Sequence, residues 1–470
     1  MHGTQHGSPE DGRTRGRGPR IPLHTKILLG LALGAVAGIA TNLLAADARW
    51  VELVITYVAQ PVGQVFLGML FMVVIPLVFT TLAVGVAGLG DLSSLGRVGG
   101  KTIAFFLATT FCAVVLGLTL ANLVAPGESI DPAVRSALLA EYSMQAADRV
   151  TASENTSFGI QTFVNIVPRN PLSAAVSGDM LGVIFFTLMF GIALTRIPPD
   201  LSGPVIRWLE GVAQAIIEII GFAMRLAPYG VAGLIFSVTA QFGLDVLRSL
   251  ALYVAMVLFG LLIHQFGTLA LVGHVFAGIH PRTLYSRARF MMITAFSTSS
   301  SNATMPTTLR TAEEEFGVPR EIAGFVIPLG ATMNMNGTAL FEGMTVLFLA
   351  QVFGIDLSIG AQLIVVIMSI ITAIGAAGVP GGSIPLLVMV LIMVGIPGEG
   401  IALILGVDRI LDMARTVPNV TGDLLASAVV ARSEGYDLVP ATAPDFSTEA
   451  AIEAMGGVVL DGQEVERQLG

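Results

Sequence analysis

An apolar segment near the carboxyl end of the chain carries an unusual set of charged and amide side chains. The stretch VDRILDMARTVPNVTGD, residues 407–423, holds three aspartates, two arginines and one asparagine between apolar flanks. At about 100° per residue, an α-helix would gather five of them within an arc of about 80°: Asp408, Asp412, Arg415, Asn419 and Asp423. Thr416 lies beside this stripe, and Arg409 lies at its edge, about 100° from Asp408. Such a face could bind a charged ligand or a cation.

Two explanations are open for charges in an apolar helix. Each charge at membrane depth costs about 2.5–3.5 kcal/mol even on the lenient insertion scale, so it needs a partner or a use. In the first explanation, Asp408 and Asp412 pair with Arg415, and the salt bridge only joins helices. That pairing leaves Asn419 and Asp423 unexplained, and it leaves about two negative charges in excess when the groups are ionised. In the second explanation, bound cations balance the excess, because unpaired charges are costly in a low-dielectric site.

Two further features would supply oxygen ligands to a cation. Pro418 cannot donate to the carbonyl of Ala414, so we expect the helix to kink or open there and to free that oxygen. In ATMNMNGTALFEG, residues 331–343, two asparagines, a threonine and a glycine interrupt an apolar helix. Amide and carbonyl oxygens suit hard cations, and no His/Cys cluster indicates a transition metal. Asparagines that only hydrogen-bond between helices are the alternative for this stretch.

The composition indicates what surrounds these groups. The chain has 470 residues, of which 54% are hydrophobic and 12% charged, whereas soluble domains carry about 25% charged residues. Apolar runs of about 20 residues, long enough to span a bilayer, begin for example at Ile27 and Ile103. We therefore expect an integral membrane protein. A single cysteine, Cys112, argues against a disulfide framework, and a net charge of −9 without a basic patch argues against nucleic acid.

Eight apolar segments are predicted to span the membrane as helices. They cover residues 26–46, 56–87, 99–125, 176–197, 205–238, 245–279, 321–353 and 399–432. Four arginines precede the first span, which places the amino terminus in the cytoplasm by the positive-inside rule. The polar, acidic segment 126–175 would then lie outside, and the acidic tail 433–470 would lie in the cytoplasm.

Two other segments differ from ordinary spans. Residues 286–311 contain STSSSNATMP, residues 357–395 contain GAAGVPGGS, and each is apolar on both sides of its polar or glycine-rich break. Non-helical backbone at membrane depth is tolerated only where protein or a water-filled cavity satisfies it. We therefore predict two re-entrant hairpins, each followed by one long helix, as inverted repeats with the ligand site at their interface. Two kinked spans are the alternative.

Four motifs, STSSSNATMP, NMNGT, GAAGVPGG and DMARTVPNVTGD, resemble the signature elements of the dicarboxylate/amino acid:cation symporters, the glutamate transporter homologues. The resemblance covers nearly all of residues 26–432. It implies an all-α polytopic membrane protein with eight transmembrane helices and two re-entrant hairpins, a homotrimer that carries its site across the membrane like an elevator. It divides the chain into a disordered cytoplasmic tail (1–25), scaffold helices (26–98 and 176–242), an outside loop (126–175), a transport domain (99–125 and 243–432) and an acidic cytoplasmic tail (433–470).

The resemblance also implies roles in binding a substrate. Asp412 would hold the substrate's amino group, and Arg415 would pair with its side-chain carboxylate through a planar, bidentate fork. The other substrate contacts would come from seven residues of the hairpin tips and neighbouring helices: Ser299, Ser301, Thr338, Val379, Gly382, Thr416 and Asn419.

Cation sites follow from the same resemblance. One sodium site would comprise Gly330, Asn334, Asn419 and Asp423, a second would comprise Thr332 with carbonyls of the second hairpin, and a further site would lie near Thr109, Thr110 and position 336. At this further site the chain departs from the family pattern. The family usually has an aspartate where this chain has Asn336, and often a tyrosine where it has Phe106. Both changes remove oxygen-ligand character, so we predict that this site is weakened or lost.

The sequence thus predicts a secondary active symporter of a cell inner membrane that takes up aspartate or glutamate with sodium. A proton is the alternative coupling ion, and no organic cofactor is expected. A C4-dicarboxylate or a neutral amino acid is the alternative substrate, although a dicarboxylate would bring no amine to Asp412. An ion channel or a non-transporting receptor is a different class. An enzyme is the weakest alternative, because no nucleophile, phosphate-binding or metal motif accompanies the acidic groups.

Overall fold

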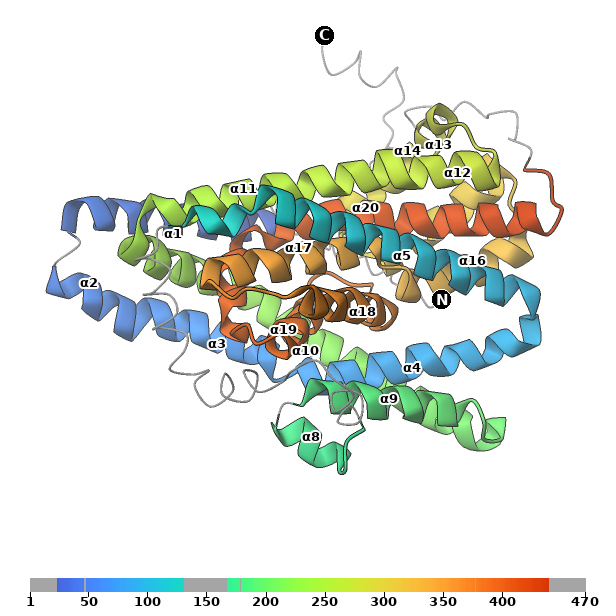
Figure 1. Cartoon of the computed structure of the whole chain (residues 1–470), viewed down its shortest axis with the longest axis horizontal. Coiled ribbons are helices and arrows are strands. Elements are labelled where there is room, and N and C mark those ends of the chain that lie inside the picture. Colours follow the sequence, from blue (N-terminus) through green and yellow to red (C-terminus); the bar gives the residue numbers. More distant parts are fainter. Residues whose placement is uncertain (1–22, 46–47, 131–166, 178, 377, 439–470) are drawn as a thin grey trace, which may run out of the picture.

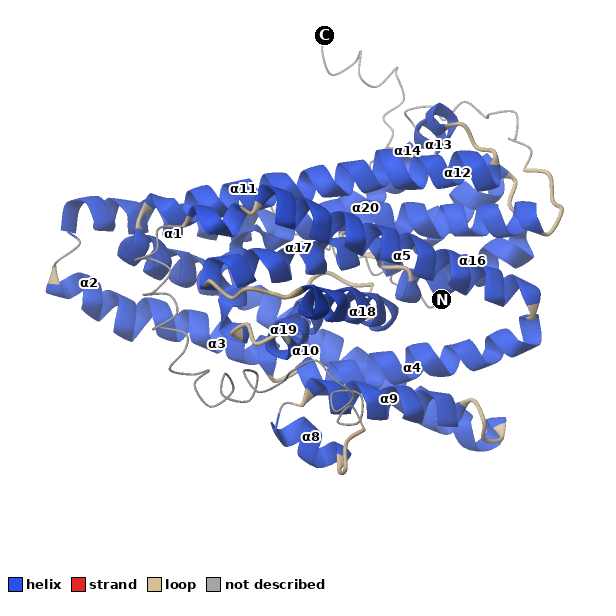
Figure 2. Ribbon diagram, in the orientation of Figure 1, coloured by secondary structure: helices blue, strands red, loops and turns tan. Residues whose placement is uncertain are grey.

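The computed structural model describes residues 23–45, 48–130, 167–177, 179–376 and 378–438, and within these ranges it consists of helices and loops without strands (Figures 1 and 2). The predicted all-helical class is confirmed. Most of the two predicted tails and most of the predicted outside loop lie outside the described residues, although α1 already begins at Leu23 and the chain is described to residue 438.

The first part of the chain forms α1 (Leu23–Ala45), α2 (Arg49–Val54), the π-helical turn η1 (Ile55–Ala59), α3 (Gln60–Phe71), α4 (Val74–Leu95), α5 (Arg97–Val124) and the 3₁₀ turn η2 (Pro126–Ser129). The middle part forms α8 (Pro171–Ser177), α9 (Met180–Leu194), α10 (Pro199–Phe242), α11 (Leu244–Ile263), the π-helical turn η3 (His264–Leu269) and α12 (Ala270–Ala277).

The last part forms α13 (Pro281–Arg287), α14 (Arg289–Thr298), α15 (Ser301–Arg310), the π-helical turn η4 (Thr311–Glu315), α16 (Arg320–Met333), α17 (Asn336–Phe353), α18 (Ile359–Gly375), α19 (Ile384–Met393), the 3₁₀ turn η5 (Gly398–Ile401) and α20 (Ala402–Ser433). Figure 1 shows the long helices lying roughly along the long axis of the molecule.

Five helical stretches of the described chain are long and apolar enough to cross a membrane: Thr25–Ala45, Arg49–Gly88, Arg97–Ser129, Pro199–Phe242 and Val246–Ala277. The second begins seven residues before the predicted span, because the charged residues Arg49 and Glu52 interrupt the apolar pattern that the prediction followed. The predicted total of eight membrane spans stays a prediction.

The helices pack in two groups. In one group, α10 packs against α1, α3 and α4, and α4 packs against α9. In the other, α17 packs against α5, and α20 packs against α14, α16 and α17. The two groups meet where α1 and α10 contact α20. The second group contains both polar stretches that the sequence singled out.

The two predicted hairpin segments each form a helix, a turn and a second helix. The first comprises α14 and α15, and the second comprises α18 and α19. Their tips touch, because the Ser300 hydroxyl donates to the Gly378 carbonyl at 2.6 Å and the Asn302 N–H donates to the same oxygen at 3.2 Å. Between them, the helix of residues 320–353 is interrupted at Asn334 and Met335, as the polar break predicted.

The helix of residues 402–433 differs from the expectation for Pro418. α20 runs without interruption through this proline, so the predicted opening of the helix is wrong. The neighbouring helix makes a close contact there instead, because Gly337 of α17 lies directly against the Arg415 carbonyl and the Pro418 ring.

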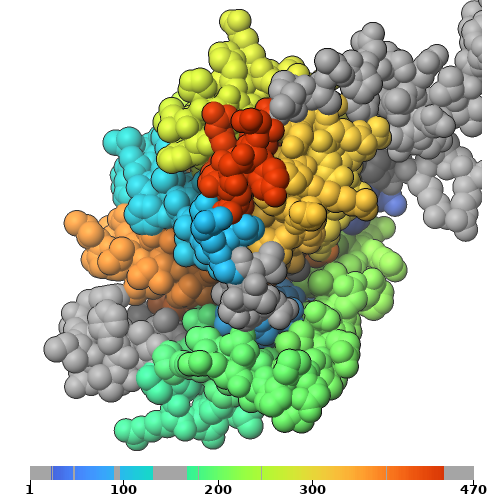
Figure 3. Space-filling view, turned by 90° about the vertical axis from the view of Figure 1, so that its right-hand side faces the viewer, coloured from blue at the N-terminus to red at the C-terminus, as the bar shows by residue number. Residues whose placement is uncertain are grey.

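An ionic contact fixes the carboxyl end of α20 to the start of α5. Glu434 accepts hydrogen bonds from Arg97 and from Lys101, with a Lys101 Nζ to Glu434 Oε1 distance of 2.7 Å. These two donors lower the pKa of the Glu434 carboxyl to about 2, and the hydrogen bond from Arg97 has the largest effect. Figure 3 looks onto this end of the molecule, where the red end of α20 lies between the yellow-green α12 to α13 region and the blue start of α5.

A glycine stripe lets α1 approach α10 closely. Gly30, Gly34 and Gly38 face the backbone of α10, and a methyl group at Gly34 would lie 2.5 Å from the Ala232 carbonyl oxygen. Small residues at four-residue spacing allow this approach between membrane helices. The stripe therefore joins the first helix to the longest one.

We predict that Gly34→Ala lowers the stability of the purified protein by about 1–3 kcal/mol, because the added methyl group must force the helices apart. Gly221→Ala is the matched control, since a methyl group there meets no atom within 4 Å and alanine favours a helix over glycine by about 1 kcal/mol. Thermal unfolding in detergent measures both. Equal melting temperatures for the two variants would contradict the close contact.

Candidate binding site

A cavity lies where the two hairpin tips, the break between α16 and α17, and α20 come together. About 280 Å³ of space there is not filled by protein atoms, and part of it is open to solvent. Eight of the nine predicted substrate residues line it: Ser299, Ser301, Thr338, Val379, Asp412, Arg415, Thr416 and Asn419. The lining also includes four residues that the sequence did not single out: Met335, Ala376, Gly378 and Ser383.

Gly382 is the predicted residue that does not line the cavity. Its N–H donates to the Val379 carbonyl at 3.1 Å, so it shapes the turn of the second hairpin. The neighbouring Gly381 has a φ of +74°, a conformation that glycine adopts without strain.

The tip of the first hairpin presents a hydroxyl group to the cavity. Ser299 ends α14 in a left-handed conformation, with a φ of 51°, which is uncommon for a residue with a side chain. Its hydroxyl is buried and has no hydrogen-bond partner among the described residues. Backbone held in such a region at a cavity is typical of a ligand site, so we infer that this hydroxyl faces a ligand.

The next residues start a helix whose amino end points at the same place. Ser300 caps α15, and its side chain accepts from the Ala303 N–H at 3.1 Å. The first backbone N–H groups of a helix favour an anion. The tip of the first hairpin can therefore hold a carboxylate.

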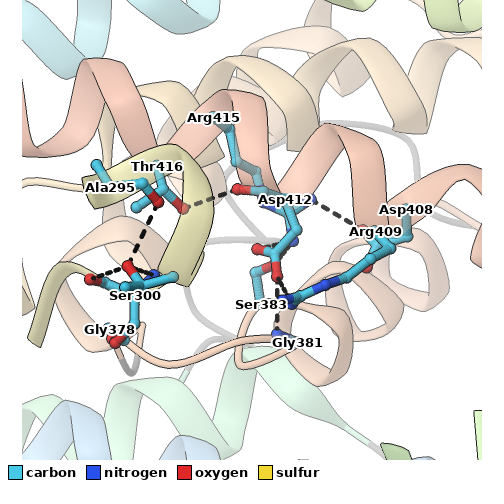
Figure 4. A network of polar contacts seen from close by, with 11 residues as sticks. Ala295, Ser300, Gly378, Gly381, Ser383, Asp408, Arg409, Asp412, Arg415 and Thr416 are labelled. Carbon is cyan, nitrogen blue, oxygen red and sulfur yellow. Dashed lines mark hydrogen bonds and ion pairs between the residues drawn. The ribbon is translucent and has the colours of Figure 1, made fainter. Parts of the chain in front are cut away.

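Arg415 is the central cation of the site. Its side chain is 1% exposed, and its guanidinium contacts Asp408 at 2.9 Å, Asp412 at 2.9 Å and the Ser383 hydroxyl at 2.8 Å. The guanidinium carbon also lies 4.2 Å from the centre of the Phe341 ring, a cation–π distance. The internal pairing that the sequence left open is thus present, and it lines a cavity rather than filling a helix interface (Figure 4).

Asp412 has its second carboxylate oxygen bound by two other donors. Arg409 Nη1 and the Gly381 N–H each lie 3.2 Å from Oδ2 (Figure 4). The sequence placed Arg409 only at the edge of the stripe and gave it no partner. The signal was the spacing of three residues between Arg409 and Asp412, which brings two side chains together on a helix.

Asp423 anchors a second group of oxygens. It is 1% exposed, and the Asn334 amide donates to Oδ1 at 2.9 Å and reaches the Asn419 carbonyl at 3.3 Å. Gly330 lies so close to the Asp423 carboxylate that any larger residue would displace it. Among the described residues no basic side chain bonds Asp423. A buried carboxylate without a basic partner, with the Asn419 carbonyl bound by the same Asn334 amide, suits a hard cation.

The other predicted cation ligands make no hydrogen bond to one another among the described residues, and their sites stay predictions. Thr332 is exposed, and its hydroxyl donates to the Leu329 carbonyl at 3.0 Å. Thr109 and Thr110 are buried in α5, but no described contact joins either to Asn336. The Asn336 amide reaches Asn334 Oδ1 at 3.4 Å, and its own oxygen has no partner among the described residues.

Two buried polar groups near the site were not assigned from the sequence. The Gln265 amide in η3 donates to the Thr421 hydroxyl of α20 at 3.0 Å. Glu342 of α17 accepts from the Thr372 hydroxyl of α18 at 2.6 Å. Neither residue lines the cavity. The sequence alone could not indicate these two contacts, because each one joins residues of different helices that are far apart along the chain.

Comparisons with known proteins show to which family the chain is similar. Residues 23–433 match the sodium:dicarboxylate symporter family. The chain is 38% identical over 416 residues to the proton/sodium-glutamate symport protein of Bacillus caldotenax, covering 88% of this chain and 95% of the relative. It is 35% identical over 415 residues to the proton/glutamate-aspartate symporter of Escherichia coli, covering 88% and 93%. It is 32% identical over 407 residues to the C4-dicarboxylate transport protein of Bacillus subtilis, covering 85% and 91%.

We predict that Asp423→Asn weakens sodium binding by at least about tenfold. The substitution keeps the shape of the side chain but removes the negative charge of the carboxylate. Sodium-dependent thermal stabilisation of the purified protein gives the half-saturating concentration. Asp356→Asn makes the same chemical change at an exposed position and should leave the half-saturating sodium concentration unchanged. An unaltered sodium response in Asp423→Asn would contradict a cation at this group.

Proposed function

Because the chain belongs to the sodium:dicarboxylate symporter family, we propose that it takes up an acidic amino acid, aspartate or glutamate, by cation-coupled symport. The chain is accordingly a transporter and not an enzyme. The observation that carries the substrate is the placement of Arg415 and Asp412 in one cavity. A guanidinium and a carboxylate side by side match a ligand that has both a carboxylate and an ammonium group.

The geometry suggests how such a ligand lies. Arg415 presents a planar fork to the side-chain carboxylate of the substrate, replacing part of its contact with Asp408 and Ser383. Asp412 takes the ammonium group. The amino end of α15, with the free hydroxyl of Ser299, takes the α-carboxylate. Thr338, Thr416 and Asn419 complete the predicted lining.

Sodium is the coupling ion that we propose, with a proton as the alternative. The group of Gly330, Asn334, Asn419 and Asp423 supports a sodium site, because it offers oxygens and an unbalanced charge. Asn419 belongs both to this group and to the substrate cavity. A cation bound there would hold one wall of the substrate site, which couples the two ligands.

For the movement across the membrane we propose an elevator in a homotrimer of the inner membrane, with both termini in the cytoplasm and eight spans plus two re-entrant hairpins. Residues 26–98 and 176–242 would form the scaffold, and residues 99–125 and 243–432 the moving domain. The packing in two groups supports this division, because α10 packs with α1, α3 and α4, whereas α20 packs with α14, α16 and α17.

Uptake of radiolabelled aspartate into liposomes tests the function directly. We expect accumulation driven by an inward sodium gradient and little with potassium in its place. Accumulation driven only by a proton gradient would keep the substrate and change the ion. No accumulation under either gradient would contradict the proposal.

We predict that Arg415→Lys lowers the affinity for aspartate by at least about tenfold, because lysine keeps the charge but loses the planar fork. Binding of a neutral amino acid such as serine should change much less, since it has no second carboxylate. Competition against labelled aspartate measures both. Lysine is used because alanine would leave Asp408 and Asp412 buried without their cation. An equal loss for aspartate and serine would count against the role of Arg415.

We propose that the further cation site near Asn336 is weakened, so that fewer ions, or a proton, drive each cycle. Asn336→Asp would restore a carboxylate whose position lies beside Asn334 and should raise the ratio of sodium flux to aspartate flux. Parallel measurements with labelled sodium and labelled aspartate give that ratio. An equal ratio of sodium flux to aspartate flux in the unaltered protein and in Asn336→Asp would contradict this hypothesis.

A further inference from the structure

We infer that Arg409 is a specificity-determining residue that competes with the substrate's ammonium group for Asp412. When the ligand has an amine, the amine replaces Arg409 on the carboxylate. When the ligand is a dicarboxylate without an amine, Arg409 stays and neutralises Asp412. The inference rests on the proposed function, because it concerns the ligands of the same cavity.

The contacts of Asp412 show where the competition occurs. Oδ1 is held by Arg415 at 2.9 Å, and Oδ2 is held by Arg409 and by the Gly381 N–H, each at 3.2 Å (Figure 4). A carboxylate oxygen can accept two hydrogen bonds, and Oδ2 already has two donors. An ammonium group that binds Oδ2 must therefore replace one of them.

Of the two arginines that bind Asp412, Arg409 is the one held by fewer contacts. Arg415 contacts Asp408, Asp412, Ser383 and the Phe341 ring, so removing it from Asp412 would disturb a connected network. Arg409 makes a single ion pair, through one terminal nitrogen, and its Nε is buried without a partner among the described residues. The Arg409 side chain is also 10% exposed, against 1% for Arg415. Arg409 therefore loses one ion pair when it turns away, whereas Arg415 would lose a connected network.

The balance of charges supports both arrangements. Asp408 and Asp412 together with Arg409 and Arg415 form a network with no net charge when all four groups are ionised. A dicarboxylate added to this network gives a formal charge of about −2. An acidic amino acid that displaces Arg409 gives the same formal charge of about −2, because it brings one positive charge and the network loses one. The same co-transported cations could therefore balance either load.

Without Arg409 the two ligand classes would no longer be equivalent. A dicarboxylate would then lie beside an Asp412 carboxylate that shares Arg415 with Asp408 and has no other cation. Leaving a buried charge without its partner is strongly unfavourable. An acidic amino acid would lose nothing and would no longer need to displace a competitor. Arg409 thus widens the range of ligands, because it neutralises Asp412 when the substrate has no amine and would otherwise be repelled.

The test compares aspartate with succinate in the full-length protein. Both compete against radiolabelled aspartate for binding, in the unaltered protein and in Arg409→Gln. We expect succinate to bind the unaltered protein, and its affinity to fall at least about tenfold in Arg409→Gln. Aspartate should bind Arg409→Gln as tightly as before or more tightly.

Two further variants separate specificity from structure. Arg409→Lys keeps a positive charge and should retain succinate binding. Arg320→Gln removes an arginine at an exposed position of α16 and should change neither ligand. Loss of folding would lower both affinities together, whereas the inference requires a change in their ratio.

Failure of the inference is distinguishable from failure of the proposed function. Aspartate binding with an unaltered ratio of aspartate to succinate affinity in Arg409→Gln would overturn the role of Arg409. Aspartate binding without any succinate binding in the unaltered protein would overturn it as well. If the unaltered protein bound neither ligand, the proposed function itself would fall.

Discussion

The structure depends on burying two carboxylates and a guanidinium on one helix without leaving a charge alone. Asp408 and Asp412 lie 2.9 Å from the same Arg415, so each ion has a partner in a buried position, where an isolated charge would be costly. Other elements complete this pairing: Ser383 comes from the second hairpin, and Phe341 comes from α17. The second hairpin and the charged groups of α20 therefore help to position each other.

Close packing between backbone segments makes this arrangement of charges possible. The first and second hairpins touch through Ser300 and Gly378, and Gly337 brings α17 directly against α20. The break between α16 and α17 leaves Asn334 free to bond Asp423. A cavity of polar atoms forms where three interruptions of helices meet, because the backbone there must find partners outside its own helix. A ligand that supplies such partners would stabilise the closed arrangement of both tips.

The sequence predicted the helical class and the position of the polar stripe, since a period of 3.6 residues puts Asp412, Arg415 and Asn419 on one face. It indicated Arg415 as a partner of Asp412 but missed Arg409 as the second one, because a helical wheel measures angles and ignores the length of the Arg409 side chain. It could not predict that Ser383 reaches Arg415, since that contact joins residues of two separate elements. The helix does not open at Pro418, because neighbouring helices can satisfy the backbone around a proline. The alternative, a kink at Pro418, stays a prediction.

The most direct test of the central claim is the affinity for aspartate, measured calorimetrically at a series of sodium concentrations. The cation group and the substrate cavity share Asn419, so binding at one should strengthen binding at the other. We expect the affinity for aspartate to rise steeply with the sodium concentration. An affinity that changes neither with sodium concentration nor with pH would contradict coupled binding at these two sites.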